Sequence, residues 1–248
     1  MQTLTKEDLR FVVSRIPRDV REMMIKYNLT IAGGFIRSTI AGEKPSDIDL
    51  FGETVEMLDN AANWIAANRR ARIHKTDNAI TILTPSRIPL QLITRWLYKE
   101  IGPLVESFDF TIAQAAIGVI VNEDGKSVSW TSFISDSFYP DLAARRLVYT
   151  FPVRNEDAGG SLLRVRKFLS KGYTIQAPAL AGTIARLISR LKWDESFNYH
   201  MKNNMIDEVW LSQVITGLLR EVDPLTIIDG IDIIDEHSII EEVINEEG

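Results

Sequence analysis

Two aspartates separated by one apolar residue, Asp47 and Asp49, are the strongest candidates for chemistry in this chain. The apolar Ile48, Leu50 and Phe51 around them predict a β-strand, in which residues i and i+2 project to the same face. Both carboxylates would then point at one place, where their mutual repulsion favours a bound cation. Mg²⁺ takes one or two protein carboxylates and completes its shell with water and substrate phosphate. The pair therefore predicts a metal site for nucleotide chemistry, with exposed residues of an edge strand as the alternative explanation.

A glycine pair, Gly33 and Gly34, stands between an expected strand over 29–32 and an expected helix over 35–41. Glycine lets backbone amides approach a phosphate closely, and a helix N-terminus adds a favourable partial charge. An isolated pair would favour a tight turn, but a pair this close before the aspartate strand favours phosphate binding. Arg37 on the same helix could reach a phosphate or pair with the aspartates, although a lone arginine is most often a surface residue.

The two motifs, read as GG-x-x-R and then S-D-I-D-L-F, resemble the nucleotidyltransferase superfamily that includes DNA polymerase beta. The head domains of bacterial-type CCA-adding enzymes and poly(A) polymerases are the most similar members. Three later segments match the family in its own order, covering roughly residues 25 to 175: IPLQLITR at 88–95, SFDFTIAQAAI at 107–117 and, more weakly, SLLRVRKFLSKGYTI at 161–175.

This resemblance implies a two-metal transfer of a nucleoside monophosphate from an NTP to a hydroxyl, with Mg²⁺, or alternatively Mn²⁺, as cofactor. The acceptor stays open between an RNA 3′ end, a protein side chain and a small molecule. Motif by motif, the resemblance assigns catalysis to Asp47, Asp49 and Asp109, metal binding to Asp47 and Asp49, and nucleotide binding to Gly33, Gly34, Arg37, Ser46 and Arg164. For Arg164, a solvated helix face is an equal alternative.

Several positions depart from the family pattern. Ser38 stands where an aspartate usually follows the arginine, Gln91 replaces an acidic residue, and Ser107-Phe108 replaces two arginines. The element that selects C and A in CCA-adding enzymes is not recoverable, and the chain is too short for their full helical body. We therefore expect no CCA-adding role. A degenerate nucleotide- or RNA-binding module of the same fold is the main alternative, and a purely structural or partner-binding protein is a third.

Composition and charge limit the class of protein that this chain could be. The chain has 248 residues, of which 45% are hydrophobic and 25% charged, as in ordinary globular proteins. No apolar run reaches the roughly 20 residues that span a bilayer, no signal-peptide pattern opens the chain, and cysteine is absent, so we expect a cytoplasmic protein without a membrane partner. The first 220 residues carry 28 basic and 24 acidic side chains. That balance permits phosphate contacts without the strongly basic face of a dedicated nucleic-acid binder.

The hydrophobic patterns predict an α+β part over 1–150 and a helical region with an acidic tail over 151–248. The resemblance implies that the first part is a polymerase beta-like nucleotidyltransferase head, an α+β fold with a mixed sheet flanked by helices. Neither predicts the oligomeric state. Helices are expected over 5–14, 17–27, 35–41, 54–70, 103–107, 162–170, 178–192 and 205–222. Strands are expected over 29–32, 47–51, 72–76, 79–84, 88–94, 108–121 and 128–131.

Overall fold

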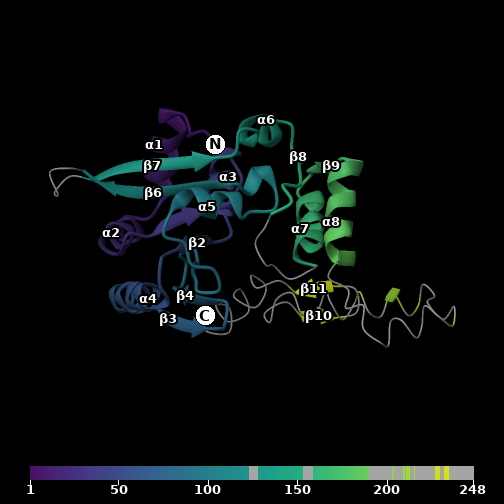
Figure 1. Cartoon of the computed structure of the whole chain (residues 1–248). Helices are drawn as coiled ribbons and strands as arrows, with labels where there is room; N and C mark the ends of the chain where they lie inside the picture. Colours follow the sequence, from purple (N-terminus) through teal and green to yellow (C-terminus); the bar gives the residue numbers. More distant parts are fainter. Residues whose placement is uncertain are drawn as a thin grey trace. The chain divides into compact units, whose positions relative to one another are not determined.

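The computed structural model describes residues 1–122, 128–152 and 159–189, together with residues 203, 209, 211, 212, 215, 227–229 and 232–234 (Figure 1). The chain divides into two compact units, Met1–Ala144 and Arg145–Gly248. The first unit contains the glycine pair and the aspartate pair. The functional boundary expected at residue 150 stays a prediction.

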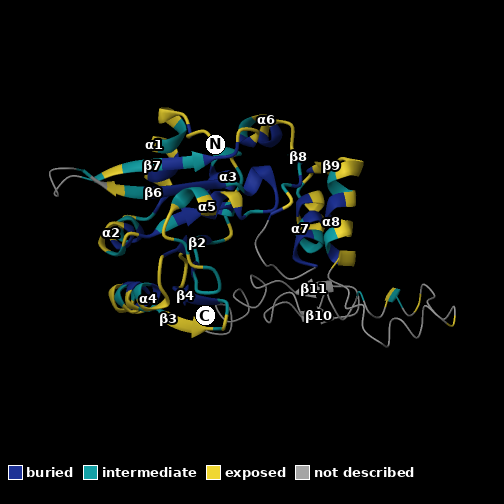
Figure 2. Ribbon diagram, viewed as in Figure 1, coloured by how far each residue is buried: buried dark blue, intermediate teal, exposed yellow. Residues whose placement is uncertain are grey.

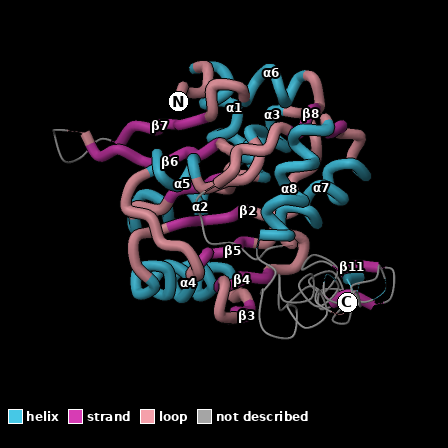
Figure 3. The backbone as a smooth tube through the Cα atoms, turned by 45° about the vertical axis from the view of Figure 1, so that its right-hand side comes forward, coloured by secondary structure: helices cyan, strands magenta, loops and turns pink. Residues whose placement is uncertain are grey.

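A seven-stranded mixed sheet forms the centre of the first unit, in the order β3-β4-β5-β2-β1-β6-β7 (Figure 3). The strand β2 pairs parallel with β5 and antiparallel with β1, and the other neighbours are antiparallel. The strands are β1 (Thr30–Ala32), β2 (Ile48–Phe51), β3 (Arg72–Lys75), β4 (Ala79–Leu83), β5 (Leu90–Ile93), β6 (Ala115–Val121) and β7 (Val128–Ile134). This arrangement confirms the α+β fold with a mixed sheet flanked by helices.

In the described part of the first unit, the α-helices are α1 (Lys6–Arg15), α2 (Arg18–Tyr27), α3 (Gly34–Ile40), α4 (Val55–Arg69), α5 (Ile101–Glu106) and α6 (Phe138–Ala143). Side-chain caps start two of them, because Thr5 Oγ1 accepts from the Asp8 N–H and Thr54 Oγ1 from the Met57 N–H, both at 3.1 Å. Such caps satisfy backbone donors that have no intrahelical partner. They explain why α1 and α4 begin where the sequence pattern expects them.

The two faces of the sheet are covered by different helices around β2. On one face, Gly52 lies so close to Leu58 of α4 that an added Cβ would come within 3.2 Å of that side chain. On the other face, Phe51 packs in a cluster with Leu104 and Val105 of α5. Alternation along β2 therefore directs Ile48, Leu50 and Gly52 to the α4 face, and Asp49 and Phe51 to the opposite face.

The strand expected over 108–121 is wrong in its first half, because strand β6 begins only at Ala115. Before it, Thr111–Ala113 form a 3₁₀ turn in which Thr111 Oγ1 donates to the buried carboxylate of Asp141 at 2.6 Å. Ser135 Oγ also donates to the Thr111 carbonyl at 3.1 Å. These buried polar contacts fix the turn, and neither partner is adjacent in sequence. The apolar sequence of this segment predicted a strand, but tertiary hydrogen bonds stabilise a 3₁₀ turn there instead.

The second unit contains a helical part and short strand pairs. Helices α7 (Gly160–Ser170) and α8 (Ala177–Ser189) pack on each other, and β8 (Arg146–Leu147) pairs parallel with β9 (Thr174–Ile175). In the acidic tail, β10 (Ile227–Asp229) pairs antiparallel with β11 (Asp232–Ile234), where we expected no strands. The helix expected over 205–222 and the end of the one expected over 178–192 lie largely outside the described residues.

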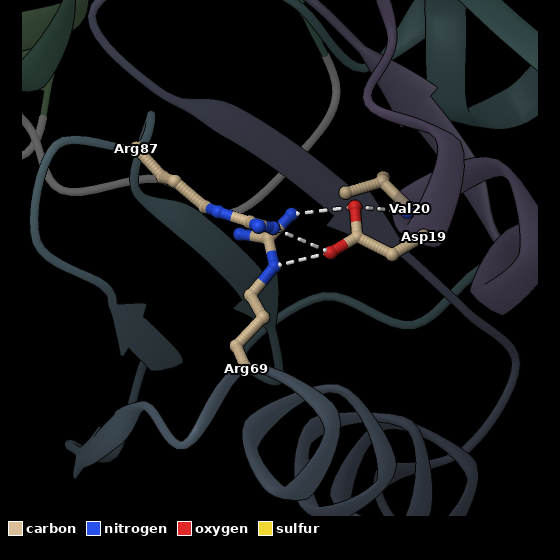
Figure 4. Close-up of polar contacts among 4 residues, drawn as sticks. All are labelled: Asp19, Val20, Arg69 and Arg87. Carbon is tan, nitrogen blue, oxygen red and sulfur yellow. Dashed lines mark hydrogen bonds and ion pairs between the residues drawn. The ribbon is translucent and has the colours of Figure 1, made fainter.

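An ion triad ties three elements of the first unit together (Figure 4). Arg69, at the end of α4, donates two hydrogen bonds to the Asp19 carboxylate, from Nε to Oδ2 at 2.8 Å and from Nη2 to Oδ1 at 2.9 Å. Arg87, in the turn between β4 and β5, donates to the same carboxylate at 2.9 Å. The Arg69 side chain is only 1% exposed, whereas Arg87 is 54% exposed. Asp19 therefore neutralises a buried charge and fixes α2 to α4.

We expect Asp19→Asn to lower the free energy of unfolding by about 2 kcal/mol at neutral pH, because it leaves the Arg69 guanidinium buried without a full counter-charge. Chemical denaturation measures this loss. Arg87→Gln is the matched control and should change stability by less than about 1 kcal/mol, because its pair is solvent-exposed. Equal losses in both variants would contradict the dominant role of Arg69.

The same carboxylate gives a pH dependence. The hydrogen bond from Arg69 holds the pKa of Asp19 below its ordinary value of 3.8, with further help from the charges of Arg69 and Arg87 and from the Val20 N–H, against an upward effect of burial. The lowered pKa means that the stabilisation is present above about pH 4 and is lost as the pH falls through the folded-state pKa. We expect the stability difference between the wild-type protein and Asp19→Asn to shrink below pH 4.

Candidate functional site

The aspartate pair lies at the beginning of the central strand β2. Pairing starts at Ile48, whose N–H donates to the Pro89 carbonyl at 3.0 Å, so Asp47 immediately precedes the strand and Asp49 lies within it. Both side chains are partly exposed; Asp49 lies between the fully buried Ile48 and Leu50, and Asp47 lies between the exposed Ser46 and the buried Ile48. Ser46 Oγ donates to Asp47 Oδ1 at 2.9 Å and so orients that carboxylate. The structure thus presents two accessible carboxylates at one end of a strand in the middle of the sheet.

Gln91 is the direct neighbour of Asp49. The parallel register of β2 and β5 pairs these two residues, and Gln91 is in turn paired with Thr81 of β4. Residues paired across strands point to the same face. Gln91 is 5% exposed and Thr81 is 2% exposed. The position where the motif resemblance leads us to expect an acidic residue therefore lies beside Asp49, and here it provides a neutral amide.

The glycine pair makes the turn from β1 into α3. Gly33 has φ +78°, a backbone conformation that favours glycine, and an added Cβ would lie 3.1 Å from Phe108 Cε1. Its N–H donates to the Ala115 carbonyl at 2.8 Å and is therefore used within the sheet. Gly34 opens the helix, where the first N–H groups have no intrahelical acceptor, and nothing lies within 4 Å of its Cβ position. Of the two amides, only that of Gly34 suits a phosphate.

Phe108, one of the residues that replace the family arginines, packs against the aromatic residues of the α5 side. Its ring lies edge-on to Phe51, with centroids 6.1 Å apart, and it fills the space beside Gly33. A cation at this position would meet apolar surroundings, since Leu104 and Val105 belong to the same cluster. Phe108 therefore contributes packing here rather than a charge for a nucleotide.

Arg37 is turned inward, with 7% of its surface exposed, and a terminal guanidinium nitrogen donates to Ser38 Oγ at 2.8 Å. Ser38 is itself buried and occupies the position where relatives carry an aspartate. The serine hydroxyl thus accepts a hydrogen bond that a carboxylate would accept with a charge. A contact between Arg37 and a phosphate stays a prediction.

Asp109 is 1% exposed and lies just before the 3₁₀ turn that Asp141 holds. Its burial favours a role in positioning this segment over direct contact with a nucleotide. The catalytic assignment of Asp109 stays a prediction. Arg164 lies on α7 of the second unit, and its assignment to nucleotide binding also stays a prediction.

The donor set limits which metal the site could hold. Within the part of the chain that the structure describes, no group of three or more His, Cys, Asp or Glu side chains is placed to hold a metal ion. Asp47 and Asp49 are two oxygen-donor carboxylates at one strand end, and that set fits Mg²⁺ completed by water and substrate phosphate. It does not fit a closed structural zinc site, which needs four nitrogen or sulfur donors.

Two residues near the site were not singled out from the sequence. Thr81 was not recognised because its place beside Gln91 depends on strand register, and Asp141 was not recognised because its partner Thr111 is 30 residues away.

A cavity of about 120 Å³ lined by Thr30, Phe51 and Glu53, among others, lies at the opposite end of β1 and β2 and does not belong to the site. No described helix is both long and apolar enough to cross a membrane.

Known structures share this fold. The CCA-adding enzyme of Thermotoga maritima in complex with tRNA superposes with a TM-score of 0.51 and 17% identity, over 98% of this chain and 54% of that enzyme. A CCA-adding enzyme in complex with ATP gives a TM-score of 0.52 and 18% identity, over 91% of this chain and 52% of that enzyme. At this identity the likeness concerns the fold, which is that of the nucleotidyltransferases.

Sequence comparison narrows the class to a family. Residues 3–145, more than half of the chain, match the Gabija anti-defense 2 family, and the chain belongs to that family. A protein of Bacillus phage SPbetaL7, Gabija anti-defense 2, is 24% identical over 163 residues, which are 63% of this chain and 36% of that protein. The chain therefore spans little more than a third of the length of this relative.

Proposed function

We propose that the chain is a metal-dependent nucleotidyltransferase that transfers a nucleoside monophosphate from an NTP to a hydroxyl acceptor. The observation that carries the proposal is the placement of Asp47 and Asp49. Both are partly exposed, Asp47 just before the central strand β2 and Asp49 within it, and β2 belongs to a sheet with the nucleotidyltransferase fold. The glycine turn from β1 into α3 precedes them.

The residues of the chain would share the work as follows. Asp47, oriented by Ser46, and Asp49 would hold Mg²⁺ and with it the triphosphate. The Gly34 N–H would donate to a phosphate oxygen, whereas the Gly33 N–H is already bonded to Ala115. Gln91, beside Asp49, would donate an amide hydrogen bond to a substrate oxygen or to the carboxylate. None of these roles requires a third carboxylate.

The transfer is a displacement at phosphorus. The acceptor hydroxyl oxygen forms a bond to the α-phosphorus, the bond from that phosphorus to the bridging oxygen breaks, pyrophosphate leaves, and the hydroxyl proton passes to solvent. When bound, Mg²⁺ supplies charge stabilisation at the phosphate oxygens. The contribution of the protein is to position the triphosphate at the beginning of β2, where the buried Ile48 and Leu50 hold the strand that carries Asp49.

The family name gives the proposal a biological setting. The phage relative is named for an activity against a defence called Gabija. We propose that this chain acts against a bacterial defence by attaching a nucleotide to an acceptor hydroxyl, on nucleic acid, on protein or on a small molecule. The solved relatives with the same fold were seen with ATP, with CTP and with tRNA, which supports an NTP as one substrate.

A second function is favoured by two specific observations: Gln91 beside Asp49 is neutral, and Phe108 packs into an apolar cluster where relatives carry an arginine. Both remove charge from the site. They favour a module that binds a nucleotide or RNA without transferring anything. This alternative shares the fold with the enzyme and differs from it in turnover.

Calorimetric titration with each NTP separates the two functions. We expect the enzyme to bind NTP only with Mg²⁺ or Mn²⁺ present, because the two carboxylates repel an uncompensated triphosphate. Binding of equal affinity in EDTA, together with no pyrophosphate release in any acceptor mixture, would overturn the enzymatic proposal in favour of the binding module.

Gln91→Glu would place a carboxylate directly beside Asp49. We expect this variant to bind Mn²⁺ about tenfold more tightly, because cation affinity rises with the number of charged oxygen ligands. Manganese binding by electron paramagnetic resonance measures the change. In an Asp49→Asn background, Gln91→Glu should not increase the affinity for Mn²⁺. Unchanged affinity of Gln91→Glu alone would show that residue 91 does not face the metal.

A further inference from the structure

The strand β3 is an exposed, basic edge of the sheet on the same unit as the aspartates. It is the first strand in the sheet order of the described residues, and all four of its residues are exposed (Figure 2). It belongs to the segment 69–75, RRARIHK, which contains four Lys or Arg residues and no acid. Such a segment is a candidate surface for a negatively charged partner.

The register of the sheet puts part of this edge on the same face as Asp49. Asp49 pairs with Gln91, Gln91 with Thr81, and Thr81 with His74. Residues paired across strands share a face, so Asp49 and His74 are the two ends of one row, and Arg72 lies two residues from His74 on that face. Three strand spacings separate the ends of the row by about 14 Å.

The other two residues of β3 point the opposite way. Lys75 forms an ion pair with Asp59 of α4, so Ile73 and Lys75 face the helix that covers the other side of the sheet. Arg69, just before the strand, is held by Asp19. The acidic side chains of α2 and α4 thus meet basic side chains that face away from the Asp49 side, and the strand alternation places Arg72 and His74 on the Asp49 side.

The ends of the row are the accessible part of this face. Gln91 and Thr81 in the middle are nearly covered, whereas Asp49 is partly exposed and His74 is exposed. A partner would therefore meet the protein at two places about 14 Å apart. A stacked nucleic-acid strand advances about 3.4 Å per nucleotide, so 14 Å corresponds to about four nucleotides.

We propose that Arg72 and His74 bind the phosphate backbone of a single-stranded nucleic acid whose 3′-hydroxyl end lies at Asp47 and Asp49 as the acceptor. Arg72 provides charge and His74 a ring hydrogen-bond donor, and neither reads a base. The acceptor of the transferred nucleotide is then a polynucleotide and not a protein or a small molecule. The inference rests on the proposed nucleotidyltransferase function.

Fluorescence anisotropy with labelled 12-nucleotide RNA and DNA of the same sequence tests this surface. We expect Arg72→Gln with His74→Gln to weaken binding of the strand about five- to tenfold at 50 mM salt, and to lower the slope of log affinity against log salt by about 0.7 for the lost charge. Arg72→Lys should keep the salt slope. Comparison of the affinities for RNA and DNA shows which of the two backbones Arg72 and His74 bind.

Lys6→Gln is the matched control, since it removes one exposed charge from α1, which packs beside β7 at the opposite edge of the sheet. It should leave strand binding unchanged. Two results would overturn the proposed binding of nucleic acid by Arg72 and His74: equal binding by the Arg72→Gln, His74→Gln variant and this control, or no binding of RNA or DNA by the wild-type protein. So would label transfer to protein alone in a lysate. Calorimetry with NTP keeps the two proposals apart, because the β3 variant should bind NTP as the wild-type protein does.

Discussion

Asp49→Asn is expected to lower the rate of nucleotide transfer on the order of 10³-fold, while the protein keeps its melting temperature within a few degrees. The substitution keeps the size of the side chain and removes the charge that holds the cation and the triphosphate. Asp49 is partly exposed, so the buried neighbours Ile48 and Leu50 keep the strand in place. Release of pyrophosphate from each NTP, with a nucleic-acid acceptor present, measures the effect.

The control for this prediction is Asp77→Asn, an exposed aspartate between β3 and β4 that removes the same charge from the same unit. It should retain the wild-type rate. Asp47→Asn is expected to behave as Asp49→Asn does, and the double variant to lose no more than the more damaging single one, because both residues serve one site. Transfer that persists in the double variant would show that the chemistry lies elsewhere.

Gly33→Ala is expected to destabilise the first unit by about 2 to 4 kcal/mol and to abolish NTP binding. Two causes act together at this residue. Its φ of +78° is strained for any side chain, and the added Cβ would meet the Phe108 ring at 3.1 Å. Relief of the clash would move Phe108 or the start of α3, and either movement displaces the Gly34 amide from the aspartates.

Gly34→Ala is the matched control, because nothing lies within 4 Å of its Cβ position and its φ is not positive. We expect its stability to be unchanged within about 0.5 kcal/mol, since it opens a helix. Urea denaturation of both variants makes the comparison. Equal stability of the two would contradict the structural role of Gly33, and a Gly33→Ala, Phe108→Ala pair should recover part of the loss if the ring is responsible.

The site was predictable from the sequence to the extent that it is local. Alternation around Asp47 and Asp49 predicted their strand, and the glycine pair predicted the turn from β1 into α3, because both signals depend on neighbours within a few residues. The hairpin of β3 and β4 was predicted for the same reason. Family motifs supplied the fold, which the solved structures confirm.

Features that depend on contacts between distant segments were not predictable. The first half of the strand expected over 108–121 contains a 3₁₀ turn instead, because Asp141 and Ser135 hold Thr111. The face shared by Asp49 and His74 follows from three successive strand registers, and one of them, the parallel pairing of β2 with β5, joins segments far apart in the sequence that no local pattern relates. The burial of Asp109 and the inward turn of Arg37 likewise result from packing, which the motif matches do not describe.

The central claim is that Asp47 and Asp49 support transfer of a nucleoside monophosphate, and the position of the transferred label tests it most directly. The protein is incubated with Mg²⁺, a single-stranded RNA ending in a 3′-hydroxyl, and NTP labelled at either the α- or the γ-phosphate. We predict that the α-label appears on the acceptor, that the γ-label appears only in pyrophosphate, and that Asp47→Asn with Asp49→Asn abolishes both. Two results would contradict the account. One is label on the acceptor from γ-labelled NTP, and the other is tight NTP binding without transfer of either label.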